Sequence, residues 1–380
     1  MIHKIRIQNF KSLRDVAVDL SPVTVFIGKS GTGKTNLTSA IRFLRDCLAS
    51  KDGGVWRDYA AWQCATNPAE PAQFQVVFSV PGFPDAFCYT LGLNRHAGAP
   101  QPEIESLEYG NRTIFRQRES NHQQMRWEVE PALVVPPEAG AIVLGRLPAL
   151  EEAVVAYTVL TAGIAVHNFP YDVLGQGVQR QGTFGQRDSS ETISGLADTG
   201  ENFLDVMVAI RNSFQPDTRR GIVATLQRIN PTVASVEIDS VQNPQTAIVG
   251  HRLGDKILPL GLHQESDGFR RFYAHLLALY QTPPKQTLVF EEPENGIYPG
   301  ALSLLAEEFN AAPEAGRGQV LLTTHSPSLL DHFSADQIRV VELVDLETHV
   351  GILEEKQRQS LAEELLHAGE LLTVDPARRQ

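Results

Sequence analysis

Alternating hydrophobic and polar residues at the start of the chain predict β-strands. Residues Ile2–Ile7 and Val16–Leu20 alternate on either side of the turn Asn9–Ser12, which predicts a β-hairpin. The continuous apolar run Val23–Ile27 predicts a buried strand, and apolar residues at helical spacing in Asn36–Leu48 predict a helix. The chain therefore begins with a hairpin that leads into a strand–loop–helix unit.

The pattern changes after this helix. Short alternating runs between Phe74 and Val129, separated by Gly, Pro and Asn, predict an antiparallel meander. Ala49–Pro71 is expected to be a loose stretch, Pro131–Pro148 a connection, and Ala149–Ala165 a helix. The Gly-, Gln-, Arg- and Ser-rich segment His167–Ala197 is predicted to be a loop.

The second half of the chain alternates predicted helices and strands. Helices are expected from Phe203, after the polar start Asp198–Asn202, and over Asp217–Ile229. Strands are expected at Ser235–Ile238 and Ala247–Val249. Together with the first half, these elements predict an α/β fold.

The loop after the first buried strand carries the clearest chemical signal. Gly28–Thr35 fits G-x-x-x-x-G-K-[ST], and it lies between a predicted strand and a predicted helix, as a phosphate-binding loop requires. Glycines let successive backbone N–H groups turn toward one point, where the helix N-terminus adds positive potential. We expect Lys34 to reach the β- and γ-phosphates and Thr35 to give its hydroxyl to Mg²⁺. The predicted nucleotide-binding residues of this loop are Gly28, Lys29, Ser30, Gly31, Thr32, Gly33, Lys34, Thr35 and Asn36.

Two carboxylates end a second predicted buried strand, Thr287–Phe290. Glu291 and Glu292 follow it directly, and charges at the end of a buried strand are costly unless they are used. In a phosphate-loop protein the first carboxylate would serve the metal ion, and the second would orient and deprotonate the attacking water. His325 follows the next apolar run, Val320–Thr324, where it is placed to contact a γ-phosphate.

Ser266 begins a third cluster, just before the amphipathic segment Phe272–Tyr280. Its hydroxyl fits a helix N-cap, and with Gly268 it also fits a γ-phosphate site for a nucleotide held by another subunit.

These motifs together resemble one family. Gly28–Thr35, Ser266–Gly268, Phe290–Gly296 and Thr324–Pro327 look like the ABC-type ATPase heads of the RecF/SMC/OLD branch, and more narrowly its compact bacterial AAA family ATPases. The resemblance implies an ABC-type P-loop ATPase head with a mixed central sheet, an antiparallel β-subdomain and a helical second lobe. It also implies a division into residues 1–148 (loop and meander), 149–234 (helical lobe) and 235–380 (signature, Walker B, D-loop and switch histidine).

The resemblance also implies roles for individual residues. Heads of this branch form head-to-tail dimers that enclose ATP and Mg²⁺. By this likeness, Thr35 and Glu291 hold the metal and Glu292 is the catalytic base, assisted by His325 and Lys34. Ser266, Asp267 and Gly268 contact the partner's nucleotide, and Asn295 lies in the loop that crosses the dimer interface. The Q-loop glutamine is either Gln63 or Gln75.

Composition indicates where the predicted ATPase acts and what it is not expected to bind. The 380 residues carry a net charge of −12, which argues against non-specific coating of nucleic acid but leaves a local basic groove possible. No apolar run is long enough to span a membrane, and the N-terminus leads straight into a strand, so we expect no signal peptide. Three cysteines without metal spacing fit a reducing cytoplasm.

The sequence therefore predicts an ATP-hydrolysing, dimerising switch. No nuclease motif is visible, so we expect a separate nuclease or TOPRIM-like effector, and the resemblance places such pairs in antiphage defence. The alternative is a RecF-like repair clamp that binds duplex DNA through Arg211, Arg219, Arg220 and Arg228, with Arg180 and Arg187 nearby in the loop. A transporter-coupling subunit and a small-molecule kinase fit the motifs less well.

Overall fold

The structure is a computed structural model, and it describes residues 1–50, 62, 64, 66–67, 70–96, 99–118, 126–129, 142–175, 195–213, 216–239 and 246–380. These residues form two compact units. The first unit is Met1–Ile164 with Ser334–Gln380, and the second is Ala165–Phe333. Most of the predicted loose stretch 49–71, the predicted connection 131–148 and the predicted loop 167–197 lies outside the described residues.

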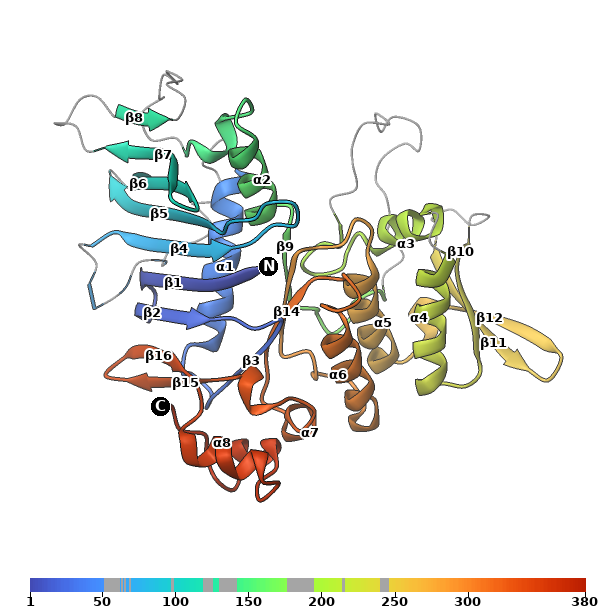
Figure 1. The fold of residues 1–380 in the computed structure, drawn as a ribbon. Coiled ribbons are helices and arrows are strands. Elements are labelled where there is room, and N and C mark those ends of the chain that lie inside the picture. Colours follow the sequence, from blue (N-terminus) through green and yellow to red (C-terminus); the bar gives the residue numbers. More distant parts are fainter. Residues whose placement is uncertain are drawn as a thin grey trace. The chain divides into compact units, whose positions relative to one another are not determined.

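A seven-stranded antiparallel sheet dominates the first unit (Figure 1). The predicted hairpin is confirmed as β1 (Ile2–Phe10) and β2 (Leu13–Asp19), and the predicted meander is confirmed as the strands that follow. The free edge of β1 pairs with β4, so hairpin and meander share one sheet in the order β2-β1-β4-β5-β6-β7-β8. The meander strands are β4 (Ala72–Phe78), β5 (Phe87–His96), β6 (Ala99–Tyr109), β7 (Arg112–Arg118) and β8 (Arg126–Val129).

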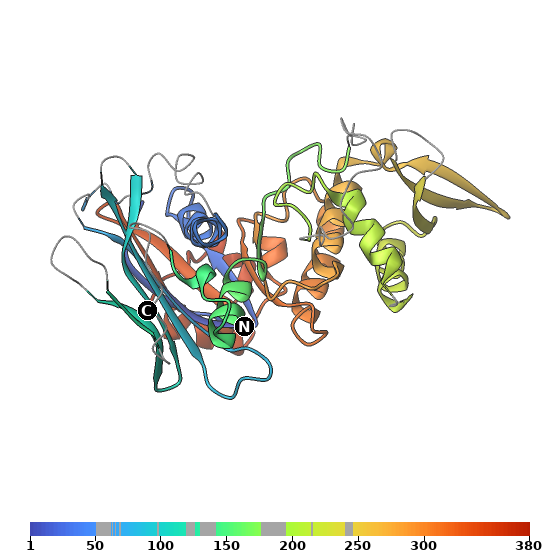
Figure 2. The ribbon, with the colours of Figure 1, turned by 90° about the horizontal axis from the view of Figure 1, so that it is seen from above.

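Helix α1 (Lys34–Ala49) covers one face of this sheet (Figure 2). Its Phe43 ring packs 5.2 Å from the ring of Phe10 on β1 and 5.7 Å from that of Phe74 on β4. Alternate residues of β4 are buried, which is the pattern of a sheet with one face against a core. The same alternation predicted this strand from the sequence.

Three strands of a mixed sheet belong to the first unit, and one of them precedes the glycine loop. β3 (Val23–Ile27) pairs in parallel with β15 (Ile338–Val344), and β15 pairs antiparallel with β16 (Glu347–Gly351). Every residue of β3 is buried, as its apolar run predicted. The C-terminal part of the chain therefore returns to support the N-terminal strand.

Helix α2 (Glu151–Leu160) corrects the predicted helix over 149–165, which was too long. The helix ends at Leu160, and β9 (Ile164–His167) follows after a turn. Gly163 fixes this end, because a Cβ there would lie only 2.5 Å from the carbonyl oxygen of Val159. Three apolar residues with two β-branched side chains among them then favour a strand.

The second unit holds three neighbouring strands of a sheet, with helices in the same unit. β13 (Thr287–Glu291) pairs in parallel with β14 (Gln319–Thr323), and the order is β14-β13-β9. Helices α5 (Asp267–Tyr280), α6 (Leu302–Ala311) and α7 (Pro327–Leu330) belong to the same unit. The predicted strands at 287–290 and 320–324 and the predicted helix at 272–280 are thereby confirmed.

The rest of the second unit is a helical lobe with a three-stranded antiparallel sheet (Figures 1 and 2). Helices α3 (Phe203–Asn212) and α4 (Pro216–Ile229) and strands β10 (Val233–Asp239) and β11 (Thr246–Leu253) agree with prediction. Strand β12 (Lys256–Gly261) was not predicted. Its first four residues are exposed and one of them is proline, so no apolar alternation marks it.

Short helical segments complete the described chain. They are α8 (Glu355–Ala362) and the 3₁₀ turns η2 (Leu144–Arg146), η3 (Leu262–Gln264), η4 (Pro299–Ala301), η5 (Ala335–Gln337) and η6 (Ala368–Leu372). Within the described ranges, no helix is long and apolar enough to cross a membrane.

Glu105 on β6 is a fully buried carboxylate in the first unit. Its oxygens accept hydrogen bonds from the backbone N–H groups of Val143 (2.7 Å) and Leu144 (2.9 Å) and from the hydroxyl of Tyr89 (3.0 Å). Burial raises the pKa of Glu105 from 4.5 to about 7, although these three donors oppose the rise. The carboxyl group therefore ties the η2 segment to the sheet while it retains its proton.

This pKa predicts that stability falls as pH rises from about 4.5 to about 7. Between these pH values the folded chain keeps the Glu105 proton and the unfolded chain loses it. The free energy of unfolding therefore falls by about 3 kcal/mol in total as the pH rises. Urea unfolding of the wild type and of Glu105→Gln, followed at several pH values, measures the difference. Equal pH slopes in the two proteins would contradict the prediction.

Candidate functional site

The predicted phosphate-binding loop lies between β3 and α1, as the sequence indicated. Gly33 occupies the N-cap position of α1 with a φ of 103°, a conformation that favours glycine. A Cβ on Gly33 would collide with the hydroxyl of Thr348 on β16, and one on Gly28 would collide with the carbonyl oxygen of Val341 on β15. Both glycines are therefore required by close packing against the mixed sheet.

Lys34 folds back over the loop. Its ammonium group donates to the carbonyl oxygens of Gly28 (2.7 Å) and Lys29 (3.0 Å), and the residue is 5% exposed. Thr35, in the first turn of α1, is exposed. The cation and the hydroxyl that the motif supplies thus lie at one end of one helix.

A chain of side-chain hydrogen bonds holds the glycine loop in place. The Asn36 amide donates to the Ser12 hydroxyl (2.7 Å), which is 2.6 Å from the Thr348 hydroxyl. Thr348 in turn donates to the carbonyl oxygen of Thr32 (2.9 Å). Ser12 ends the turn that the sequence predicted, whereas nothing in the sequence marked Thr348.

The two predicted carboxylates lie at the end of β13 in the second unit. Glu291 accepts a hydrogen bond from the side chain of Asn168 (2.7 Å), a residue that sequence reasoning missed. Glu292 follows with a φ of 45°, an uncommon value for a non-glycine residue. Its backbone N–H donates to both the carbonyl (3.1 Å) and the hydroxyl (3.2 Å) of Thr323 on β14, which holds it in that conformation.

Glu292 has polar partners on both sides. The amide of Asn295 donates to its Oε2 (2.9 Å), and Nε2 of His325 lies 3.7 Å from its Oε1. The side chains of Glu292 and His325 are 41% and 34% exposed, so a ligand and water can reach them. The structure therefore brings together three of the predicted site residues: Glu292, Asn295 and His325.

Glu294 lies beneath this group and connects its parts. One carboxylate oxygen accepts from the hydroxyl of Thr324 (2.8 Å) and from the backbone N–H of His325 (2.8 Å). The other oxygen is buried without a hydrogen-bond partner among the described residues, and burial raises the pKa of this carboxyl group. The sequence showed Glu294 within a motif but gave it no role.

Ser266 is the N-cap of α5, as predicted, and its hydroxyl accepts from the N–H of Phe269 (3.3 Å). Gly268 lies so close to the segment after Asn295 that a Cβ on it would be 2.9 Å from the carbonyl oxygen of Gly296. Asp267 is paired with Arg270, and hydrogen bonds from Tyr171 and Arg270 hold its pKa below the usual value. The signature residues and the Asn295–Gly296 turn are therefore neighbours within one unit.

The structure describes one of the two Q-loop candidates and neither of the two expected loop arginines. Gln75 lies on β4 and hydrogen-bonds the Cys88 thiol, and Gln63, the other Q-loop candidate, lies outside the described residues. Arg180 and Arg187 also lie outside them. Over the ranges that the structure covers, no three His, Cys, Asp or Glu side chains gather into a metal-binding group.

Two of the four arginines of the expected basic face are paired with carboxylates. Arg228 is paired with Glu307 (2.6 Å), and Arg220 lies 3.6 Å from Asp217. Arg211 and Arg219 alone among these four have no carboxylate partner within the described residues. This pairing reduces the positive surface that a duplex-binding clamp needs.

Two segments of the chain match known protein families. Residues 210–331 match the family described as "AAA domain, putative AbiEii toxin, Type IV TA system", and residues 1–70 match "AAA ATPase domain". These segments contain most of the predicted site residues, including the glycine loop, Ser266, Glu292 and His325.

A curated relative adds a second likeness. The chain is similar to the Old nuclease of Escherichia phage P2, at 23% identity over 356 residues. The match covers 86% of this chain and 56% of the phage protein, so the chain spans about half the length of that relative.

Solved structures with this fold include two SMC heads. One is the SmcHead bound to the C-winged helix domain of ScpA, with a TM-score of 0.56 and 14% identity, covering 94% of this chain and 99% of that one. Another is the Smc head domain with an extended coiled coil bound to the C-terminal domain of ScpA derived from Pyrococcus furiosus. Its TM-score is 0.55 at 13% identity, covering 96% of this chain and 99% of that one. The fold expected from the motifs is confirmed.

Proposed function

We propose that this chain, an ABC-type ATPase head of the SMC/OLD-like kind, is a switch that dimerises on ATP and separates after hydrolysis. The observation that carries the proposal is the carboxylate of Glu292, which is held between the Asn295 amide and the His325 imidazole at the end of a buried strand. A carboxylate fixed in this way and open to water is suited to act as a general base.

The glycine loop binds the phosphates in this proposal. The ammonium of Lys34 exchanges its hydrogen bonds to Gly28 and Lys29 for oxygens of the β- and γ-phosphates, and the backbone N–H groups of the loop add further donors. The bonds from Thr348 and Asn36 hold the loop in place, so little ordering has to accompany binding.

Thr35 and Glu291 each have the chemistry of a Mg²⁺ ligand. Thr35 offers an exposed hydroxyl and Glu291 a carboxylate oriented by Asn168, and both are oxygen ligands of the kind that this ion prefers. The ion that they would hold would supply positive charge to offset that of the phosphates.

Hydrolysis follows from the arrangement around Glu292. The carboxylate accepts a proton from a water molecule as that water attacks the γ-phosphorus, and the bond to the β–γ bridging oxygen breaks, giving ADP and phosphate. Asn295 keeps the carboxylate aimed, and His325 contacts the γ-phosphate. Glu294 positions the His325 backbone through its hydrogen bond.

The signature of one chain completes the site of another. Ser266, Asp267 and Gly268 at the start of α5 contact the γ-phosphate held by a second copy, and Asn295 lies at the interface. Each nucleotide is then touched from both sides, so ATP favours the paired state and loss of the γ-phosphate releases it.

Loss of the loop cation should weaken nucleotide binding. Replacing Lys34 by alanine removes charge-assisted hydrogen bonds to phosphate, so we expect ATP affinity to fall by about 10- to 100-fold. Titration calorimetry with Mg-ATP measures this affinity. Lys256→Ala, which removes an exposed lysine of β12, is the matched control and should bind as the wild type does. Equal ATP affinity of Lys34→Ala and wild type would contradict the assignment of Lys34 to phosphate binding.

We further propose that the switch controls a separate nuclease or TOPRIM-like protein in antiphage defence. The likenesses to an AbiEii-type AAA domain and to a phage Old nuclease support this role. Purification of the chain from its native operon tests it: a nuclease that elutes with the chain, and whose activity changes in a Glu292→Gln background, is expected. Full protective activity from the chain alone would contradict it.

A further inference from the structure

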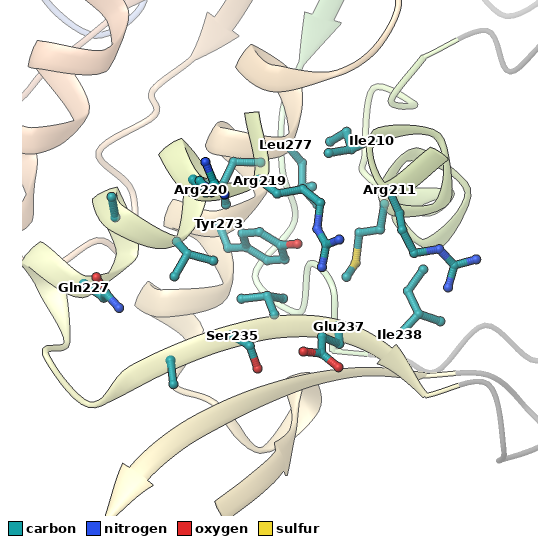
Figure 3. A pocket seen from close by; sticks show the side chains of 16 residues that line it. Ile210, Arg211, Arg219, Arg220, Gln227, Ser235, Glu237, Ile238, Tyr273 and Leu277 are labelled. Atoms are coloured by element: carbon teal, nitrogen blue, oxygen red, sulfur yellow. The ribbon is translucent and has the colours of Figure 1, made fainter. Parts of the chain in front are cut away.

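A hollow in the second unit is lined by none of the residues of the glycine loop or of the group around Glu292 (Figure 3). It has a volume of about 790 Å³ and is lined by α3, α4, α5 and β10. Ile210, Ile222 and Leu277 give it an apolar lining. Pockets that hold organic ligands have volumes of about 300–1,000 Å³, so this hollow has a suitable size.

Arg219 supplies a cation to the hollow without a carboxylate to neutralise it. Its neighbours on α4 differ, because Arg228 is paired with Glu307 at 2.6 Å and Arg220 lies 3.6 Å from Asp217. Among the described residues, no Asp or Glu lies within ion-pair distance of Arg219. An unpaired guanidinium beside an apolar lining is a ready partner for an anion.

Tyr273 on α5 adds a hydroxyl group to the lining. The residue is 3% exposed and lines the hollow, and its hydroxyl has no hydrogen-bond partner within the part of the chain that the structure describes. A phenolic hydroxyl can donate one hydrogen bond, so this group is able to bond to a ligand. Figure 3 shows this oxygen turned toward the side on which the Arg219 guanidinium lies. Burial raises the pKa of Tyr273, and the charge of Arg219 opposes that rise, so the two groups interact electrostatically.

The opposite wall is a strand with acceptors. Glu237 and Ser235 of β10 face the hollow across from the helices (Figure 3). The negative charge of Glu237 disfavours a second anionic group on that side. Arg219 and Tyr273 therefore lie on the helical wall of the hollow, and Glu237 lies on the wall that the strand forms.

We infer that this hollow is a binding site for a small organic anion with an apolar body. The phosphate or carboxylate of the ligand pairs with the guanidinium of Arg219 and accepts a hydrogen bond from the hydroxyl of Tyr273. The apolar body lies against Ile210, Ile222 and Leu277. None of the lining residues belongs to the nucleotide-binding loop, and the inference does not depend on ATP hydrolysis.

A pair of fluorescent probes tests the anion requirement. 8-Anilinonaphthalene-1-sulfonate has an apolar body and one anionic group, and N-phenyl-1-naphthylamine has the same body without the sulfonate. Titration of the full chain in the absence of nucleotide should give one sulfonate-probe site per chain. That site should weaken about 10- to 100-fold in Arg219→Gln and about 3- to 10-fold in Tyr273→Phe.

The control variant is Arg228→Gln, which removes an arginine from the same helix but does not touch the hollow. It should bind the sulfonate probe as the wild type does, and circular dichroism should show all three variants folded. Equal binding in Arg219→Gln and wild type, or equal binding of the neutral probe, would overturn the inference.

Competition identifies the anionic group. Displacement of the sulfonate probe by adenosine monophosphate indicates a phosphate ligand, and displacement by decanoate indicates a carboxylate ligand. Either result supports the inference. Displacement by a short DNA duplex but by neither small anion would overturn it in favour of a nucleic-acid surface.

Discussion

Replacing Glu292 by glutamine is expected to lower ATP turnover by about 10²- to 10⁴-fold while ATP still binds. Glutamine keeps the shape of the side chain and can still accept the hydrogen bond from Asn295, which is 2.9 Å in the wild type. It cannot take a proton from the attacking water. The substitution therefore removes the chemistry and leaves the geometry, and phosphate release at saturating ATP measures the loss.

The control for this variant is Glu314→Gln, which makes the same change at an exposed position of the second unit. It should turn over ATP at the wild-type rate. A Glu292→Gln enzyme with more than about a tenth of wild-type turnover would assign the general base elsewhere. Because ATP binding is measured separately, a loss of affinity cannot be mistaken for a loss of chemistry.

Replacing Phe290 by alanine is expected to destabilise the protein by about 3–5 kcal/mol. The ring is fully buried and packs against those of His167 (5.5 Å between centroids), His275 (5.3 Å) and Phe309 (4.9 Å). Burial lowers the pKa of His275 to about 3, so its imidazole is neutral at ordinary pH and behaves as part of an apolar cluster. Removal of the ring leaves a cavity directly beneath the Glu291–Glu292 strand end.

Urea unfolding monitored by circular dichroism measures this loss. Leu365→Ala, at an exposed position, is the control and should change stability by less than about 0.5 kcal/mol. If Phe290→Ala cost less than about 1 kcal/mol, the ring cluster would not be the core that supports the site.

The sequence predicted the elements that carry a regular pattern. The apolar run of β13 is buried throughout its first four residues, and its position before two glutamates located the site. The serine before an amphipathic segment predicted the N-cap of α5. Both succeed because burial and capping leave a local signature that depends on a few adjacent residues.

The sequence could not predict contacts between distant residues. Thr348 supports the glycine loop from 316 residues beyond Thr32, and Asn168 reaches Glu291 from 123 residues before it, so no local pattern marks either. The predicted helix ran past the end of α2 because the apolar residues after Gly163 continue the helical spacing. Close packing at that glycine ends the helix instead. Strand β12 was missed because it is exposed and carries no alternation.

The most direct test of the switch is the solution mass of Glu292→Gln with and without Mg-ATP, by light scattering after size exclusion. A variant that binds ATP but does not hydrolyse it should accumulate as the ATP-bound dimer. Adding Ser266→Arg, which places a bulky cation at the start of α5, should abolish the shift, whereas Ser334→Arg at another helix start should not. An ATP-dependent change from monomer to dimer that needs Ser266 is the predicted result, and an unchanged mass with ATP bound would contradict the account.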